Sequence, residues 1–291
     1  MEPQRRRHAE QRRARQLTAE QKAAYQRMLD KLKQSGLTAE DAEKLGYKAC
    51  TEEESAELGL SRTGAGFLLP YFDLDGKPLK TFRYRYFDVP INTWTKKQER
   101  KYDQPHGSDP EIYLPPGVEW SEIAIDTSQP VIITEGELKA ASGAKHIEPT
   151  VGLGGVWNFG SKARFQNLLP TLRDKFKWAG RVVYICFDSD VADNTQSIMA
   201  ENRLAECLTD LLATVTIVRI PKDKVNAEKK VDPSIVLVLP GEDHPKDQPA
   251  TPVAVAGPLC LRVVVVVGTV KYISRTCRPR SSSHPPFTCA A

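Results

Sequence analysis

Four acidic residues stand at the ends of two apolar, β-branched segments. After VIIT come Glu135 and Glu137, on either side of Gly136, and after VVYICF come Asp188 and Asp190. In parallel α/β sheets, ligands gather at the carboxyl ends of the strands. Oxygen-rich clusters of this kind suit the hard cations Mg²⁺ and Mn²⁺. The pattern therefore predicts a divalent-metal site that positions phosphate oxygens and offsets the charge that develops in phosphoryl transfer.

The spacing of these residues fits such a site, although each motif alone also fits an ordinary turn. Gly136 permits a tight turn from strand to helix. Asp188 and Asp190 are two residues apart, so they can face the same side of an extended segment. Aspartate and glycine are, however, common in turns. The combination is more specific, because strand, EG, helix, strand, helix and a strand ending in DxD follow in order within residues 131–190.

A mostly parallel sheet flanked by helices is predicted for residues 126–225, because strand-like and helix-like segments alternate there. The expected strands are 131–134, 150–153, 181–187 and 215–220, and the expected helices are 138–145, 165–176 and 197–212. The stretch GLGGVWNFGSK does not fit a Walker A loop, because one residue separates its last glycine from Lys162. No nucleotide-driven motor is therefore expected. Trp157 and Phe159 are expected in the core, with base stacking as the alternative.

A small α+β unit is predicted for residues 35–125. Asp75 and Gly76 form a strong turn signal between two apolar runs, which predicts a β-hairpin. The second strand of this hairpin alternates aromatic residues with Arg83 and Arg85. An arginine row beside aromatic rings can hold a nucleic acid strand. An ordinary half-buried strand with a charged outer face fits the same pattern.

Residues 1–34 combine a basic arm with a helix. They hold ten Lys and Arg against four Asp and Glu. The arginines of this arm include Arg5, Arg6 and Arg7. Such an arm can meet a phosphate backbone, or it can be a solvated helix or terminus. Thr18 and Gln21 fit a capping box at the start of the helix, and Thr38 and Thr51 fit the starts of two shorter ones.

Residues 226–291 are predicted to form a mostly disordered tail. Nine of the 21 prolines lie in the last 60 residues, together with half of the cysteines. The segment lacks amphipathic periodicity and clean helix caps, although 235–239 fits a short strand. One hypothesis is that this tail is read in a shifted frame.

The composition predicts a cytoplasmic protein with no membrane partner. No apolar segment follows the basic N-terminus, as a secretory signal requires, and no stretch of about twenty apolar residues could span a bilayer. The six cysteines form no CxxC pair, which argues against a zinc site and a disulfide framework. The net charge of +4 is mild and by itself indicates no partner.

The segments TEGELKAASGAKH, PTVGLGGVWNF and VVYICFDSDVADN resemble the TOPRIM domain of topoisomerases, DnaG-type primases and some nucleases. They look closest to a TOPRIM-like domain of unknown function in phage and plasmid replication-type proteins, and the resemblance extends over about residues 35–221. It implies that Glu135 is the catalytic glutamate, acting as metal ligand or general acid/base. It also implies that Asp188 and Asp190 hold the metal and that Glu137 supports it.

The resemblance implies a divalent-metal-dependent enzyme of a mobile element, with primase-like nucleotidyl transfer in DNA replication as the expected activity. The cofactor would be Mg²⁺ or Mn²⁺, and the partners would be single-stranded or primer–template DNA and a helicase. The alternatives are a TOPRIM-type nuclease, a non-catalytic DNA-binding accessory and a degraded remnant. Lys139 departs from the pattern, because several replicative primases have an acid there, and it is expected to contact phosphate instead. A second departure is the lack of an N-terminal zinc finger.

Overall fold

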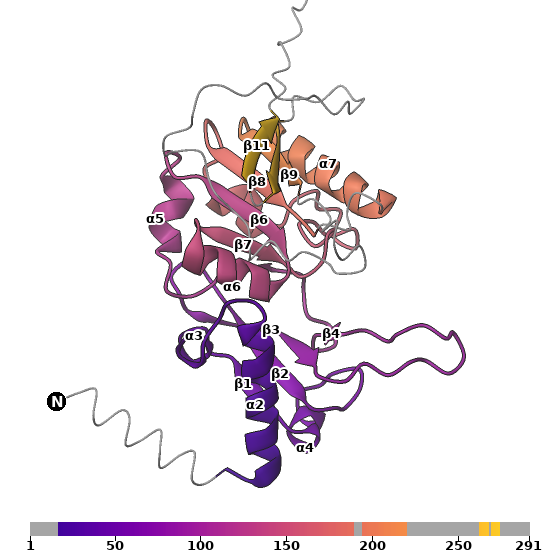
Figure 1. The fold of residues 1–291 in the computed structure, drawn as a ribbon. Helices are drawn as coiled ribbons and strands as arrows, with labels where there is room; N and C mark the ends of the chain where they lie inside the picture. Colours follow the sequence, from indigo (N-terminus) through magenta and orange to yellow (C-terminus); the bar gives the residue numbers. More distant parts are fainter. Residues whose placement is uncertain (1–16, 189–193, 220–261, 268, 274–291) are drawn as a thin grey trace, which may run out of the picture.

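The computed structural model describes residues 17–188, 194–219, 262–267 and 269–273 of the 291-residue chain. In these residues the chain forms a four-stranded antiparallel sheet, followed by a seven-stranded, mostly parallel sheet with helices. Figure 1 shows the first sheet in indigo and purple, below the second sheet in magenta and orange. The predicted fold class, an α/β sheet preceded by a small α+β unit with a hairpin, is confirmed.

The N-terminal unit holds three helices and four strands of the described residues. The helices are α2 (Ala19–Lys33), α3 (Ala39–Lys44) and α4 (Glu52–Ala56), and the strands are β1 (Lys48–Cys50), β2 (Gly66–Phe72), β3 (Pro78–Tyr86) and β4 (Tyr102–Asp103). Each helix begins after a threonine, Thr18, Thr38 or Thr51, that forms a capping box with the third helical residue. The β2–β3 hairpin turns at Gly76, whose φ is 73°. These caps and this turn confirm the sequence predictions.

The second sheet has the strand order β11-β10-β9-β8-β6-β7-β5 among the described residues. Its strands are β5 (Ile112–Tyr113), β6 (Val131–Glu135), β7 (Thr150–Leu153), β8 (Val182–Cys186), β9 (Thr214–Arg219), β10 (Arg262–Val267) and β11 (Thr269–Ile273). The strands from β10 to β7 pair in parallel, whereas β11 and β5 run antiparallel at the two edges. The carboxyl ends of β6, β7, β8 and β9 therefore meet at one edge of the sheet.

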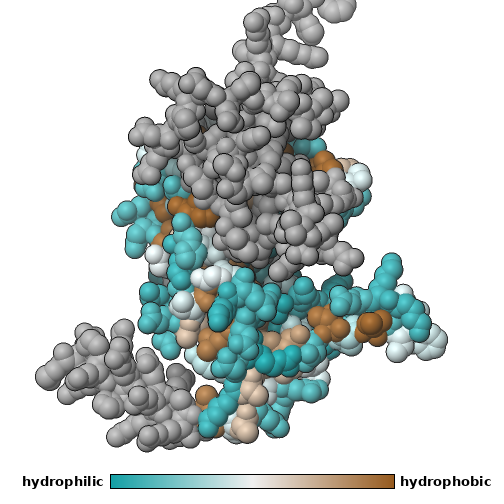
Figure 2. Space-filling view, in the orientation of Figure 1, coloured by the Kyte–Doolittle hydropathy of each residue, from teal (hydrophilic) through white to brown (hydrophobic). Residues whose placement is uncertain are grey.

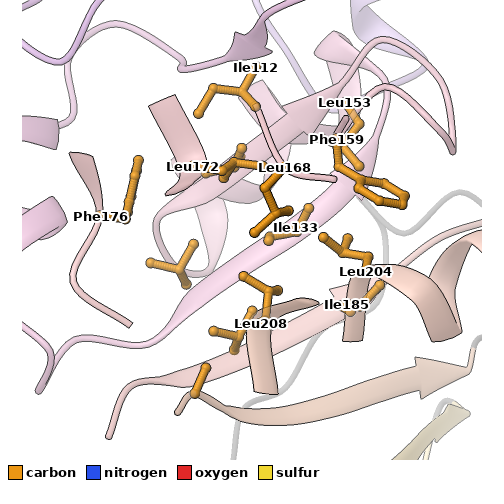
Figure 3. Packing of buried hydrophobic residues seen from close by; sticks show 14 of the residues in the cluster. Ile112, Ile133, Leu153, Phe159, Leu168, Leu172, Phe176, Ile185, Leu204 and Leu208 are labelled. Carbon is orange, nitrogen blue, oxygen red and sulfur yellow. The ribbon is translucent and has the colours of Figure 1, made fainter. Parts of the chain in front are cut away.

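Helices pack on both faces of this sheet. They are α5 (Trp120–Ile125), α6 (Glu137–His146), α7 (Thr195–Asp210) and a single π-helical turn, η1 (Thr171–Lys175). One face packs on α5, α7 and η1, and Figure 3 shows Ile133, Ile185, Leu172 and Leu204 meeting in that core. All four are 0% exposed, and each such side chain contributes about 1.5–3 kcal/mol by leaving water. Because β5 and α5 belong to this unit, it begins before the predicted boundary at residue 126.

α6 lies between the opposite face of the second sheet and the N-terminal unit. Gly143 of α6 packs so tightly on β7 that an added Cβ would lie 2.5 Å from the hydroxyl of Thr150. Leu138 and Ala141 of the same helix join the apolar cluster of the N-terminal unit, which includes Leu32. α6 is therefore held by both units, and this packing fixes the position of its first turn.

The predicted helix over 165–176 is wrong in its first part. Phe165 has a positive φ of 54° and is 96% exposed, so it belongs to a turn. The helical conformation is confined to η1. Leu168 and Leu172 are both buried at a spacing that is typical of a helix. Tertiary packing buries Leu168 without helical hydrogen bonds, which the periodicity alone does not reveal.

Two strands lie within the stretch 226–291 that the sequence predicts to be mostly disordered. β10 extends the sheet in parallel with β9, and β11 pairs antiparallel with β10. Both are rich in β-branched residues, which favour strands. The rest of this stretch, with the strand expected at 235–239, lies outside the described residues, and the prediction for it stays a prediction. Among the described helices, none is both long and apolar enough to cross a bilayer.

Candidate functional site

Glu135 and Asp188 stand at the ends of two neighbouring parallel strands. Thr134 of β6 pairs with Cys186 of β8. Glu135 is the next residue of β6, and Asp188 lies two residues beyond the end of β8. Neighbouring strands are about 5 Å apart. The fold therefore brings both predicted residues to the same carboxyl edge, whereas Asp190 lies outside the described residues.

Gly136 turns the chain from β6 into α6. Its backbone φ angle is 95°, a value that residues other than glycine rarely adopt. Its N–H donates a hydrogen bond of 2.7 Å to the carbonyl oxygen of Leu153, at the end of β7. No side chain of the described residues caps α6. The first N–H groups of α6 have no hydrogen-bond partner within the helix. They therefore lie at the same carboxyl edge of the sheet as Glu135.

Lys139, in the first turn of α6, forms an ion pair with Asp188. The two side chains are only 16% and 17% exposed. A carboxylate that is largely removed from water requires a nearby counter-charge or hydrogen bonds. Lys139 supplies that counter-charge from the neighbouring helix. The sequence predicts a phosphate contact for Lys139, and the structure adds that its ammonium reaches one of the predicted metal ligands.

Glu137 is buried, with 1% exposure, and contacts the N-terminal unit. Its Oε1 accepts a hydrogen bond of 2.8 Å from the hydroxyl of Tyr71 and lies 3.3 Å from Nη1 of Arg83. Burial and the nearby carboxylate raise the pKa of Tyr71 well above its usual value, so the phenol stays protonated. Burial by itself would lower the pKa of Arg83, but Glu137 together with Tyr71 and Tyr102 raises that pKa above its usual value. The described contacts of Glu137 thus join the two units, and its predicted support of a metal stays a prediction.

Arg83 and Arg85 do not form the exposed row that the hairpin pattern suggests. The Arg83 side chain is 15% exposed, and Arg85 is 8% exposed. Arg83 also donates to the carbonyl oxygen of Gly154, just after β7, and its guanidinium lies 5.0 Å from the ring centre of Tyr102. β3 is an inner strand, and Tyr102 with the loop after β7 covers its arginine face. This burial corrects the expectation of an accessible nucleic acid surface on β3.

The donor chemistry of the edge fits a divalent cation that binds together with substrate. Among the described residues, no group of three or more His, Cys, Asp or Glu side chains is placed to hold a metal ion. Two carboxylates, Glu135 and Asp188, stand at the edge. Mg²⁺ usually takes one or two carboxylates and completes its shell with waters and substrate phosphates. Glu135 and Asp188 therefore match the number of protein carboxylates that such a site usually has. Asp190 lies outside the described residues.

The other predicted residues fall into two groups. Phe159 is 3% exposed and belongs to the core, with the ring of Trp157 at 6.0 Å, as expected. Arg5, Arg6 and Arg7 lie outside the described residues, so their nucleic acid contact stays a prediction.

Sequence reasoning missed the buried joint that holds α6 against the N-terminal sheet. Tyr71 and Glu137 are 66 residues apart in the chain. Tyr47, before β1, and Tyr113 of β5 form a second buried contact between the two units, with their hydroxyl oxygens 2.9 Å apart. No local pattern links residues so distant in sequence.

Part of the chain is similar to a known protein family. Residues 119–238 match the family described as a domain of unknown function (DUF3854). The matched range spans the strands from β6 to β9 and includes the whole candidate edge. The description names no activity and shows no link to the TOPRIM domain. No curated protein and no solved structure gives a significant match to the chain.

Proposed function

We propose that the unit containing β6 to β9 catalyses divalent-metal-dependent phosphoryl transfer on nucleic acid, as a primase-like nucleotidyl transferase. One observation carries this proposal: two parallel neighbours, β6 and β8, bring Glu135 and Asp188 to the same carboxyl edge. The resemblance to TOPRIM domains supports it, because those domains place a glutamate after the first strand and a DxD after the third. Replication of a phage or plasmid, with a helicase partner, is the setting that this resemblance suggests.

Each residue of the edge has a role in this proposal. Glu135 would act as metal ligand or as general acid/base toward the attacking hydroxyl. Asp188, together with Asp190, would hold Mg²⁺ or Mn²⁺. The bound cation would supply charge neutralisation and alignment of the phosphate oxygens. Lys139 and the N–H groups of the first turn of α6 would bind phosphate oxygens.

Calorimetric titration of the full chain with Mg²⁺ and Mn²⁺ tests the proposal. The wild type is compared with Asp188→Asn/Asp190→Asn, and each titration is repeated with single-stranded DNA present because phosphates help to complete Mg²⁺ sites. Asp174→Asn/Asp210→Asn is the matched control, since both residues are exposed and lie outside the edge. Binding that is lost in the first variant and kept in the control is the expected result. A folded wild type that binds neither cation, with or without DNA, contradicts the proposal.

The ion pair between Lys139 and Asp188 favours a second candidate, a non-catalytic DNA-binding accessory. The lysine balances the charge of Asp188 without any metal. Salt-sensitive DNA binding that survives Glu135→Gln, in a protein without metal-dependent polymerase or nuclease activity, would support this candidate. Metal-dependent activity that is abolished by Glu135→Gln would exclude the accessory. The reaction products would then show whether the enzyme synthesises primers or cleaves strands.

A further inference from the structure

Residues 87–101 form an arm that projects from the N-terminal sheet. The arm leaves β3 after Tyr86 and returns to β4 at Tyr102. Figure 1 shows it as the long purple loop that extends away from both sheets, next to the label β4. At about 3.3 Å per residue, a hairpin of this length can reach roughly 25 Å from its base.

The arm has a defined hairpin conformation. Ile91 and Gln98 form an antiparallel bridge across it. The N–H of Asn92 donates to the carbonyl oxygen of Lys97 at 2.9 Å, and the Asn92 side chain accepts from the N–H of Trp94 at 3.0 Å. Local hydrogen bonds of this kind, typical of an Asx turn, fix the position of the tip relative to the two sides of the arm.

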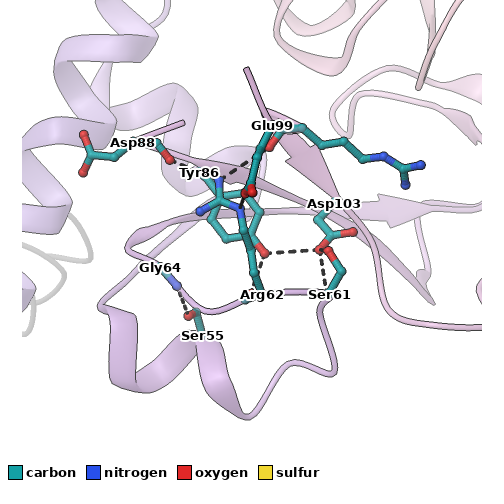
Figure 4. A network of polar contacts seen from close by, with 9 residues as sticks. Ser55, Ser61, Arg62, Gly64, Tyr86, Asp88, Glu99 and Asp103 are labelled. Carbon is teal, nitrogen blue, oxygen red and sulfur yellow. Dashed lines mark hydrogen bonds and ion pairs between the residues drawn. The ribbon is translucent and has the colours of Figure 1, made fainter. Parts of the chain in front are cut away.

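Arg62 holds the base of the arm, as Figure 4 shows. Its guanidinium lies 3.5 Å from the ring centre of Tyr86 and donates a hydrogen bond of 3.1 Å to the carbonyl oxygen of Asp88. On the returning side, it lies 3.7 Å from the carboxylate of Glu99. One half-buried cation therefore contacts both sides of the arm, which limits how far the arm can swing.

The tip of the arm presents a tryptophan to solvent beside basic side chains. Trp94 is 91% exposed and Ile91 is 63% exposed. Lys96 and Lys97 follow after Thr95 and are exposed as well. By contrast, Trp120 and Trp178 are 2% and 3% exposed. Figure 2 shows hydrophobic and hydrophilic side chains side by side along this projecting arm. The observation that points to a ligand is the combination: Trp94 and Ile91 expose apolar surface together, next to two cations, at the tip of a projecting arm.

We propose that this arm binds single-stranded nucleic acid, with Trp94 stacked on an unpaired base and with Lys96 and Lys97 on phosphates. Aromatic stacking combined with cationic contacts to the backbone is the general mode of binding to single strands. A duplex keeps its base faces stacked and would leave the indole without a partner. The inference rests on the proposed function for the class of ligand, a nucleic acid, and it adds the strand type and the contact surface.

The base of the arm lies close to the candidate edge. Arg83, three residues before the arm, contacts Gly154 after β7 and Glu137 at the start of α6. Tyr102, where the arm returns, lies under the guanidinium of the same arginine. A strand bound at the tip would therefore reach the carboxyl edge of the second sheet only by running back along the arm to its base.

Fluorescence anisotropy of a labelled oligothymidylate with the full chain, in EDTA, tests this inference. Trp94→Ala should weaken binding about tenfold or more, and Trp94→Phe, which keeps a π face, should bind within about threefold of the wild type. Lys96→Gln/Lys97→Gln should reduce the slope of log K against log salt by about 1.4, because each phosphate contact to a single strand contributes about 0.7. Matched controls are Leu212→Ala, which removes another exposed apolar side chain, and Lys175→Gln/Lys177→Gln.

Either of two results overturns the inference. The first is that Trp94→Ala binds oligothymidylate as tightly as the wild type. This is also the result expected if the arm binds another protein and not a nucleic acid. The second is an equal loss of affinity for a duplex of the same length. EDTA separates this test from the proposed function, because it removes divalent cations before oligonucleotide binding is measured. Normal Mg²⁺ or Mn²⁺ binding by Trp94→Ala, with oligonucleotide binding weakened, would leave the proposed function standing, whereas loss of cation binding in Asp188→Asn/Asp190→Asn tests that function separately.

Discussion

The ammonium of Lys139 and the carboxylate of Asp188 form an ion pair that joins the first turn of α6 to the end of β8. The carboxylate is one of the residues proposed to hold a metal, and the lysine already balances its charge. A divalent cation bound at this edge would compete with Lys139 for the oxygens of Asp188. In the proposed function the lysine would then be free to contact a substrate phosphate, and the site would have two states that differ in which cation Asp188 contacts.

Lys139→Gln should strengthen the binding of Mn²⁺ by the full chain about fivefold. Removal of the competing ammonium frees Asp188 from an ion pair worth about 1 kcal/mol, which corresponds to that ratio. Calorimetry with Mn²⁺ measures the change. Lys145→Gln is the control, because Lys145 lies on the same helix but pairs with Asp41. Weaker Mn²⁺ binding by Lys139→Gln would contradict the competition and make the lysine part of the binding site.

Glu137→Gln should lower the free energy of unfolding by about 3–5 kcal/mol. The substitution leaves the guanidinium of Arg83 buried without its counter-charge, which is the main destabilising effect when one half of a buried pair is removed. Urea denaturation gives the value. The double variant Arg83→Met/Glu137→Leu should lose less than the sum of the two single changes, because the pair acts as a unit. Additive losses would show that the two charges do not interact.

Gly143→Ala should destabilise the protein by about 1–3 kcal/mol through overpacking between α6 and β7. An added Cβ would lie 2.5 Å from the Thr150 hydroxyl, so the helix or the strand must move. Thr150→Ala in the same chain removes that hydroxyl and should restore part of the loss. Thermal unfolding of the single and double variants measures both effects. A neutral Gly143→Ala would mean that α6 moves away from the sheet without loss.

Asp103→Asn should destabilise the protein at neutral pH and make its unfolding less sensitive to acid. Burial would raise the pKa of Asp103, but hydrogen bonds from Ser61 and from the N–H of Gln104 outweigh it and lower that pKa below its usual 3.8. A lowered folded-state pKa stabilises the protein above the usual value, and this contribution disappears as the pH falls through the folded-state pKa. Denaturation curves between neutral and acid pH measure the slope. Asp210→Asn, at an exposed position, should leave it unchanged.

Local patterns in the sequence were sufficient to predict most helices, the hairpin and the positions of β6 to β9, but not β5, β10 or β11. Capping boxes at Thr18 and Thr38 and the glycine turn at Gly76 depend on residues a few positions apart, so the sequence displays them directly. The segment around Phe165 was mispredicted for the opposite reason. Its apolar spacing is helical, but long-range packing sets its backbone.

The acids that end β6 and β8, and the glycine that precedes α6, are local features and can be read from the sequence. The partners of the charged side chains around them follow from the packing of distant elements. The inner position of β3 turned Arg83 toward Glu137, and the tight packing of α6 on β7 brought Lys139 to Asp188. Such pairings depend on which elements become neighbours in space. Because an unpaired buried charge is unfavourable, each of these charges is paired in the folded protein. The sequence alone does not show which residue is its partner.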